Sequence, residues 1–115
     1  MAQYNHLPIY KTAYDLLLEL MNITKNYPRE FKFSLGEKIQ NAIVELLLNI
    51  YKANSSRDKK VFLLDIIEQI QYINILVRIS KDLKIIPVER YAKIIVQTSS
   101  IAKQAQGWMN SIDVI

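Results

Sequence analysis

The 115-residue sequence contains no cysteine, two glycines, three prolines and one histidine. Without cysteine the chain forms neither disulfide bonds nor thiolate metal sites, and it has no cysteine nucleophile, which fits a reducing compartment. The scarcity of glycine and proline predicts long uninterrupted elements. The leucine, isoleucine, lysine and glutamate content indicates that these elements are helices. The sequence therefore predicts an all-α protein.

The single histidine, His6, lies before the first predicted helix and rules out several helical active sites. A di-iron bundle needs a Glu-x-x-His motif on each of two helices, and an H-E-x-x-H zinc site needs two histidines. A Ser/His/Asp triad would depend on this one residue. Gly36 and Gly107 cannot form a glycine-rich phosphate loop. We therefore expect no enzymatic activity, no metal, no cofactor and no small-molecule substrate.

The sequence also lacks long hydrophobic runs. No apolar run approaches the roughly 18 residues that a membrane span requires, and the N-terminus lacks the layout of a signal peptide. These absences predict a cytoplasmic protein without membrane contact. Half of the residues are apolar and 23% are charged, as in folded domains. A chain of this length is expected to form a single domain over residues 1–115.

Apolar residues recur at helical spacing in four segments, at about residues 8–27, 35–54, 57–84 and 87–112. Pro8 is suited to a first helical turn, and Pro28 blocks continuation of the first helix. Ser34 and Glu37 have the spacing of a capping box at the start of the second helix. Short connections between consecutive long helices favour antiparallel neighbours, which predicts an up-down-up-down four-helix bundle.

The third predicted helix carries more apolar surface than an isolated bundle needs. Within residues 61–79, 13 of 19 residues are apolar. Leu64, Tyr72 and Ile75 fall among the polar positions of a helical wheel. A helix in a single bundle needs an apolar arc only somewhat wider than about 100°. The excess predicts a second buried face, and the second predicted helix has a similar surplus that neighbouring subunits could cover.

Positive charge is concentrated at one end of the predicted bundle. In an antiparallel arrangement the first and third turns meet, and residues 23–39 and 77–93 supply nine basic and four acidic side chains, a net charge of +5. The rest of the chain holds six basic and seven acidic residues. The candidate residues for binding nucleic acid or a partner are Lys25, Arg29, Lys32, Lys38, Arg78, Lys81, Lys84, Arg90 and Lys93. Lysines near helix C-termini also interact favourably with the helix dipole, so a structural role stays open for them.

Other candidates are weaker. The basic turn at residues 57–60 is a smaller site at the opposite end, partly offset by its aspartate. Asp65 and Glu68 share a helix face that Glu45 could approach, but a solvated helix surface is the favoured interpretation.

For the tyrosines in apolar stripes, core packing with the hydroxyl at the rim is expected. These tyrosines are Tyr10, Tyr14, Tyr51 and Tyr91.

Several stretches resemble the accessory variability determinant (Avd) of diversity-generating retroelements. They are LPIYKTAYDLLLEL, NYPREFKFSLGEKIQNAIVELLLNIYKANSSRDKK, LVRISKDLKIIPVERY and a late GW, and together they cover nearly the whole chain. The most specific markers are SLGEKI after PREFKF, and RISKDL before the fourth helix. A sister family, the four-helix proteins encoded in intervening sequences of 23S ribosomal RNA genes, shares the fold. Its SNIAEG-like segment is replaced here by LLNIYKAN, which favours Avd.

The resemblance implies a four-helix protomer assembled as a ring-like homopentamer. It also implies association with the element's reverse transcriptase and template-repeat RNA, in support of mutagenic retrohoming, without polymerase activity of its own. Binding would use basic surface residues, and Arg78, Lys81 and Lys84 in the RISKDLK match are preferred. The alternative is a bundle of the 23S intervening-sequence type that acts as a structural protein-interaction oligomer and binds no nucleic acid.

Overall fold

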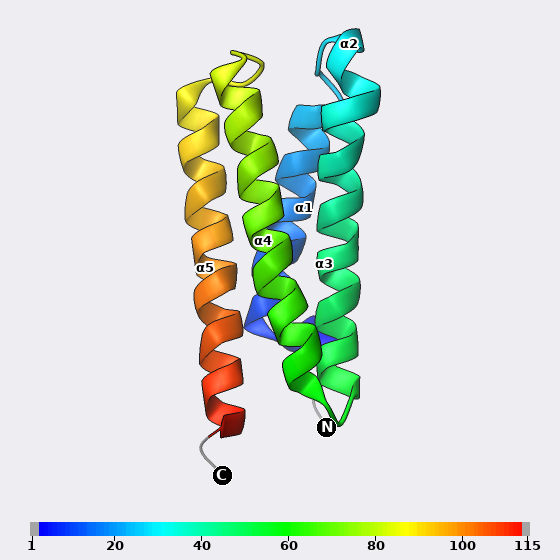
Figure 1. Cartoon of the computed structure of the whole chain (residues 1–115), viewed down its shortest axis with the longest axis vertical. Helices are drawn as coiled ribbons and strands as arrows, with labels where there is room; N and C mark the ends of the chain where they lie inside the picture. Colours follow the sequence, from blue (N-terminus) through cyan, green and yellow to red (C-terminus); the bar gives the residue numbers. More distant parts are fainter. Residues whose placement is uncertain (1–2, 114–115) are drawn as a thin grey trace.

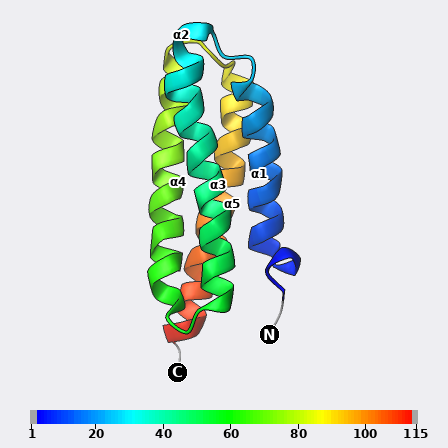
Figure 2. The same ribbon diagram turned by 90° about the vertical axis from the view of Figure 1, so that its right-hand side faces the viewer.

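The computed structural model describes residues 3–113, which are all-helical and contain no strand (Figure 1). The long helices are α1 (Pro8–Thr24), α3 (Glu37–Ser55), α4 (Lys59–Asp82) and α5 (Val88–Asp113). Three short elements, η1 (Tyr4–His6), α2 (Arg29–Phe31) and η2 (Lys32–Gly36), precede α1 and α3. The long helices alternate in direction (Figures 1 and 2). The predicted four-helix fold is therefore confirmed.

The bundle is a rod of 48 × 21 × 20 Å whose core runs along its whole length. Around the rod the helices follow the order α1, α3, α4 and α5, and α5 returns to α1, so that α1 and α4 lie diagonally opposite. Leu20, Ile43, Ile70 and Ile94, one from each long helix, are fully buried. Each such side chain stabilises the fold by about 1.5–3 kcal/mol. Within the described range, no helix has the length and apolar character of a membrane span.

The second helical segment begins earlier than the sequence predicts. The backbone N–H groups of Phe31 and Lys32 donate to the carbonyl oxygen of Pro28 at 2.8 and 2.9 Å, so the chain is already helical in α2. It continues through the π-helical η2 into α3. The Ser34 hydroxyl donates to the carbonyl oxygen of Glu30 at 3.5 Å and caps no helix. The predicted capping box is wrong because this serine lies inside a helical stretch instead of at its start.

The second apolar face predicted for α4 is present and lies on the outside of the chain. We name it the α4 ridge, and it consists of Val61, Leu64, Tyr72, Ile75, Ile79 and Leu83. These side chains are 41–58% exposed. Their spacing of three, four or eight residues places them on one side of the helix, opposite Ile70 and the other core residues. The excess of apolar surface is thus confirmed, whereas its burial stays a prediction, because within one chain nothing in the described range covers it.

A second exposed apolar surface lies between α1 and α3. We name it the α1–α3 face, and it consists of Tyr14 and Leu18 with Val44, Leu48 and Tyr51. The Tyr4 ring adjoins it, with its centroid 5.1 Å from that of Tyr51 in an edge-to-face contact. Tyr14 and Tyr51 are 45% and 47% exposed, so the expectation that they pack in the core is wrong. They fall just outside the arc that α1 and α3 turn toward the core.

Candidate nucleic-acid interface

Both predicted basic turns lie at the same end of the bundle, the upper end in Figures 1 and 2. We call this region the basic end. It gathers the nine predicted residues from the α1 terminus, α2, η2, the first turn of α3, the end of α4 and the start of α5. They are Lys25, Arg29, Lys32, Lys38, Arg78, Lys81, Lys84, Arg90 and Lys93. The fold thus places together residues that are up to 68 positions apart in the sequence.

Two of the nine cations are engaged by a carboxylate from α1. Arg90 Nη1 lies 3.3 Å from Glu19 Oε1, and Lys93 Nζ lies 3.6 Å from Glu19 Oε2. The Glu19 side chain is only 13% exposed, so solvent screens these contacts less than a surface pair. Counting Glu19, five acidic residues oppose nine basic ones, and the net charge of the basic end falls from +5 to +4. Arg90 and Lys93 therefore also hold α5 against α1.

The end of α4 carries a looser cluster. Lys81 Nζ lies 3.3 Å from an Asp82 carboxylate oxygen and 4.8 Å from the centre of the Tyr91 ring. Arg78 reaches the same carboxylate at 3.9 Å, but its side chain is 72% exposed. Exposed pairs of this kind contribute about 0–1 kcal/mol. Arg78 consequently stays accessible to a ligand, whereas Lys81 is partly held by its aromatic neighbour.

The remaining five cations are exposed and make no ion pair within residues 3–113. They are Lys25, Arg29, Lys32, Lys38 and Lys84. Phe33, which follows Lys32 in η2, is 73% exposed and lies among them. Proteins that bind single-stranded nucleic acid combine cations for the backbone with exposed aromatic rings on which bases stack. The basic end offers both.

Lys84 has a left-handed backbone conformation, with φ of 61°. It follows the C-cap of α4, and its N–H donates to the Lys81 carbonyl oxygen at 2.9 Å. The N–H of Ile85 donates to the Ser80 carbonyl oxygen at 2.8 Å, which completes a Schellman motif. Glycine is the usual residue at this position because a Cβ atom there costs roughly 1–2 kcal/mol. The chain instead places a cation at a strained turn of the basic end.

Replacement of this lysine by glycine should therefore stabilise the fold. We expect Lys84→Gly to raise the free energy of unfolding by about 0.5–1 kcal/mol, because it removes the Cβ strain. Urea denaturation followed by circular dichroism measures the change. The control is Lys84→Ala, which also removes the charge but keeps the Cβ atom. Equal stability of the alanine and glycine variants would show that the strain is absent.

Two side-chain hydrogen bonds, one buried and one partly buried, hold the basic end together. The Tyr27 hydroxyl donates to Ser80 Oγ at 2.8 Å and ties the turn after α1 to α4. The Gln40 amide donates to Thr24 Oγ1 at 2.9 Å and ties α3 to α1. Burial raises the pKa of Tyr27, and the bond to Ser80 opposes part of that rise. The turn after α1 is thus fixed to α4, and the end of α1 is fixed to α3.

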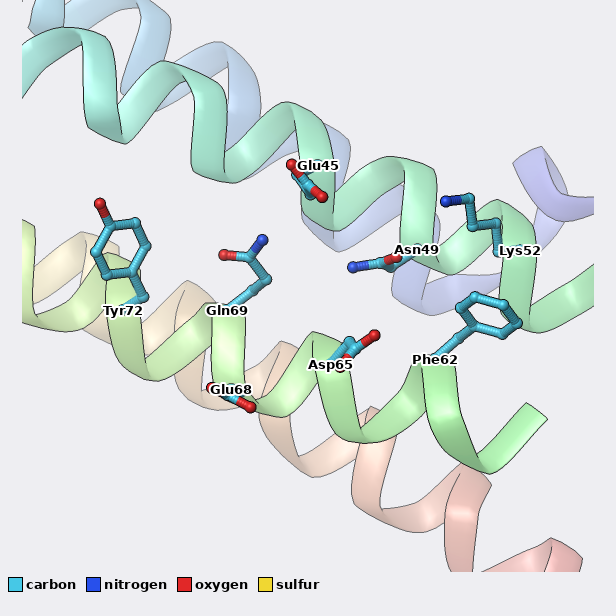
Figure 3. A pocket seen from close by; sticks show the side chains of 8 residues that line it. All are labelled: Glu45, Asn49, Lys52, Phe62, Asp65, Glu68, Gln69 and Tyr72. Carbon is cyan, nitrogen blue, oxygen red and sulfur yellow. The ribbon is translucent and has the colours of Figure 1, made fainter. Parts of the chain in front are cut away.

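A groove of opposite charge lies between α3 and α4 (Figure 3). Its volume is about 490 Å³. The residues that line it are Glu45, Asn49 and Lys52 from α3, and Phe62, Asp65, Glu68, Gln69 and Tyr72 from α4. The three carboxylates line the same groove, and with one lysine they give the lining a net charge of −2. This charge repels phosphate. Within residues 3–113, no group of three or more histidine or acidic side chains is arranged to hold a metal ion.

The basic turn at residues 57–60 serves the fold. Lys59 Nζ donates to the carbonyl oxygens of Ala53 and Asn54 at 3.0 and 2.9 Å. Both carbonyls belong to the last turn of α3, where a helix leaves its carbonyl oxygens without partners. A lysine at this position also interacts favourably with the negative end of the helix dipole. Lys59 of this turn is therefore a helix cap.

A family model described as bAvd-like matches residues 7–112, which is nearly the whole chain. The chain belongs to the bAvd-like family. The resemblance drawn from SLGEKI and RISKDL is thereby confirmed, and the protein is an Avd-type accessory protein. A search of curated proteins found no significant match.

The structure of this bAvd-like protein adds residues that the sequence did not indicate. Glu19 gave no signal, because its partners lie more than 70 positions away. Ser80 was indicated by the sequence. It lies three residues after the buried Val77, so the helical spacing of α4 predicts a core position that is occupied by a polar residue. Phe33 was recognisable only as an apolar residue between cations. Its exposure depends on η2, whose first residues the sequence placed in the connection before the second predicted helix.

Proposed function

We propose that this bAvd-like protein is a non-enzymatic accessory that binds the reverse transcriptase and template RNA of a diversity-generating retroelement and supports mutagenic retrohoming. The family supports the accessory role. The observation that carries the RNA part is the basic end, which holds the exposed Phe33 and five exposed cations that make no ion pair within residues 3–113. Side-chain hydrogen bonds hold the turns beneath, so the backbone positions that carry the cations are ordered.

Binding of RNA at the basic end should depend steeply on salt. Lysine and arginine contacts to phosphates release counterions, so the binding constant falls with salt by a power close to the number of contacts. If the five unpaired cations contact single-stranded RNA, a plot of log K against log salt should have a slope of about −3 to −4. Fluorescence anisotropy with a labelled template-repeat RNA measures this slope. Failure to retain RNA even at low salt would contradict the proposal.

We also propose that the protein acts as a ring-like homo-oligomer, with five copies as the family resemblance implies. The α4 ridge and the α1–α3 face support assembly, since both are exposed apolar surfaces larger than isolated apolar side chains. They differ from one another and lie on different sides of the rod. Contact between unlike surfaces is head-to-tail, and it produces a ring when the rotation closes.

The alternative is a structural protein-interaction oligomer that binds no nucleic acid, as in the 23S intervening-sequence type. The same two apolar surfaces favour it, because they support assembly without reference to RNA. The two functions differ in one measurement. Co-purification with a neighbouring reverse transcriptase and its RNA supports the accessory function, whereas normal assembly without RNA retention supports the alternative.

A further inference from the structure

The outward side of α1 carries an apolar residue between two cations at regular spacing. Lys11, Leu18 and Lys25 are each seven residues apart, so they lie along one line of the helix surface. All three are exposed, and Leu18 is 52% exposed. Leu16 and Leu20, in contrast, are fully buried. This line forms one edge of the α1–α3 face.

The outward side of α4 has the same spacing with the opposite charge. Glu68, Ile75 and Asp82 are also seven residues apart. Ile75 belongs to the α4 ridge and is 58% exposed. Asp65 and Glu68 are the two charged residues between Leu64 and Tyr72, both are exposed, and Glu68 is the one on this line. The α1 line thus has an apolar residue between two positive ones. The α4 line has an apolar residue between two negative ones, so the two lines are complementary in charge.

The two lines also lie at the same height in the bundle. Both helices run toward the basic end, where α1 ends at Thr24 and α4 ends at Asp82 (Figure 1). Lys11 lies 13 residues before the end of α1, and Glu68 lies 14 residues before the end of α4. When two bundles stand side by side in the same direction, the charged positions and the apolar positions of the two lines therefore face each other.

We infer that a second copy of this chain packs its α1–α3 face against the α4 ridge. Leu18 of one copy lies against Ile75 of the next, and Lys11 of one copy lies opposite Glu68 of the next. This inference rests on the homo-oligomer of the proposed function and specifies its contact. Because α1 and α4 are diagonally opposite, a two-fold contact cannot pair both lines at one interface. The contact must repeat from copy to copy, as in a ring.

Lys11 and Glu68 are the pair on which the contact can be tested most cleanly. Within residues 3–113 neither makes an ion pair, whereas Asp82 already lies near Lys81 and Arg78. Glu68 also belongs to the acidic groove of Figure 3, together with Glu45 and Asp65. A lysine that the neighbouring copy places beside Glu68 is attracted by the negative charge of this groove. A carboxylate placed there is repelled by it.

The experiment is a charge swap followed by light scattering during dilution. Lys11→Glu and Glu68→Lys should each raise the concentration at which the oligomer dissociates by about tenfold or more, because like charges then face each other at every contact. The double variant should return to within about threefold of the unchanged protein, since it restores an opposite pair. Lys103→Glu, on the outward side of α5, is the control and should dissociate as the unchanged protein does.

The outcomes separate the contact from the assembly. Rescue in the double variant supports the contact, because a residue needed only for folding would not be rescued by a second reversal. An oligomer that is unaffected by either single reversal, or a double variant no better than the singles, overturns the contact and leaves the proposed oligomer in place. A monomer at all concentrations for the unchanged protein overturns both.

Discussion

A triple reversal at the end of α4, Arg78→Glu with Lys81→Glu and Lys84→Glu, should lower the affinity for single-stranded RNA by roughly a hundredfold at about 0.15 M salt. Each lost phosphate contact removes the favourable release of one counterion, and each new carboxylate adds repulsion. The slope of log K against log salt should become shallower by roughly 1, because Lys84 is one of the five unpaired cations and Arg78 stays accessible. Anisotropy titrations of the same labelled RNA at several salt concentrations measure both quantities.

A matched control separates the site from the overall charge. Lys52→Glu with Arg57→Glu and Lys103→Glu changes the net charge by the same amount, but all three residues lie away from the basic end. It should weaken binding only a few-fold. Equal losses from the two triple variants would show that RNA responds to the overall charge and that the basic end is not the site.

The fold must survive the reversal for this result to be informative. Carboxylates near the C-terminus of α4 oppose the helix dipole by about 0.3–1 kcal/mol each. A neutral series, Arg78→Gln with Lys81→Gln and Lys84→Gly, avoids this cost and relieves the strain at position 84. It should keep its helical content and show an intermediate loss of RNA affinity.

The second large effect is expected at Ile75. Arginine at this position should convert the proposed oligomer to monomers at micromolar concentration, because it places a charge in the middle of the proposed apolar contact. The protomer should keep its free energy of unfolding, since Ile75 is 58% exposed within one chain. Light scattering and urea denaturation give the two readouts. A ring that persists in Ile75→Arg would exclude the α4 ridge from the contact.

Ile70 provides the matched control on the same helix. It is fully buried in the bundle core. Ile70→Ala should lower the free energy of unfolding by about 2–5 kcal/mol through lost burial and a residual cavity. Any oligomer that Ile70→Ala forms should contain the same number of copies as that of the unchanged protein. The pair of isoleucines distinguishes a residue that stabilises the protomer from one that stabilises the assembly.

Much of the fold follows from local sequence signals. The four helices lie where the apolar spacing placed them, because each long helix buries one face in a shared core. The excess apolar surface of the third predicted helix was also visible, since the sequence shows how many apolar residues exist. The sequence does not show which of these apolar residues face a partner chain. The early start after Pro28 was not predicted, because the N-cap of α2 is a proline, which makes no side-chain capping hydrogen bond.

The candidate site was predictable in outline only. Antiparallel helices must bring the first and third turns together, so the position of the basic end followed from the fold class. Whether each cation is free or engaged in an ion pair did not follow from the sequence, because it depends on side chains that are distant along the chain. Glu19 engages two of the cations across the bundle, and Lys84 takes a backbone conformation that its residue type does not suggest.

The bonds from Tyr27 to Ser80 and from Gln40 to Thr24 have a consequence for the entropy of binding. Ordering a flexible loop around a ligand costs roughly 0.5–1.5 kcal/mol for each side chain that is immobilised. At the basic end the backbone is ordered before any ligand arrives. An RNA strand docking there would leave the backbone entropy of the protein almost unchanged, and the loss on association would fall on the exposed cationic side chains and on the flexible strand.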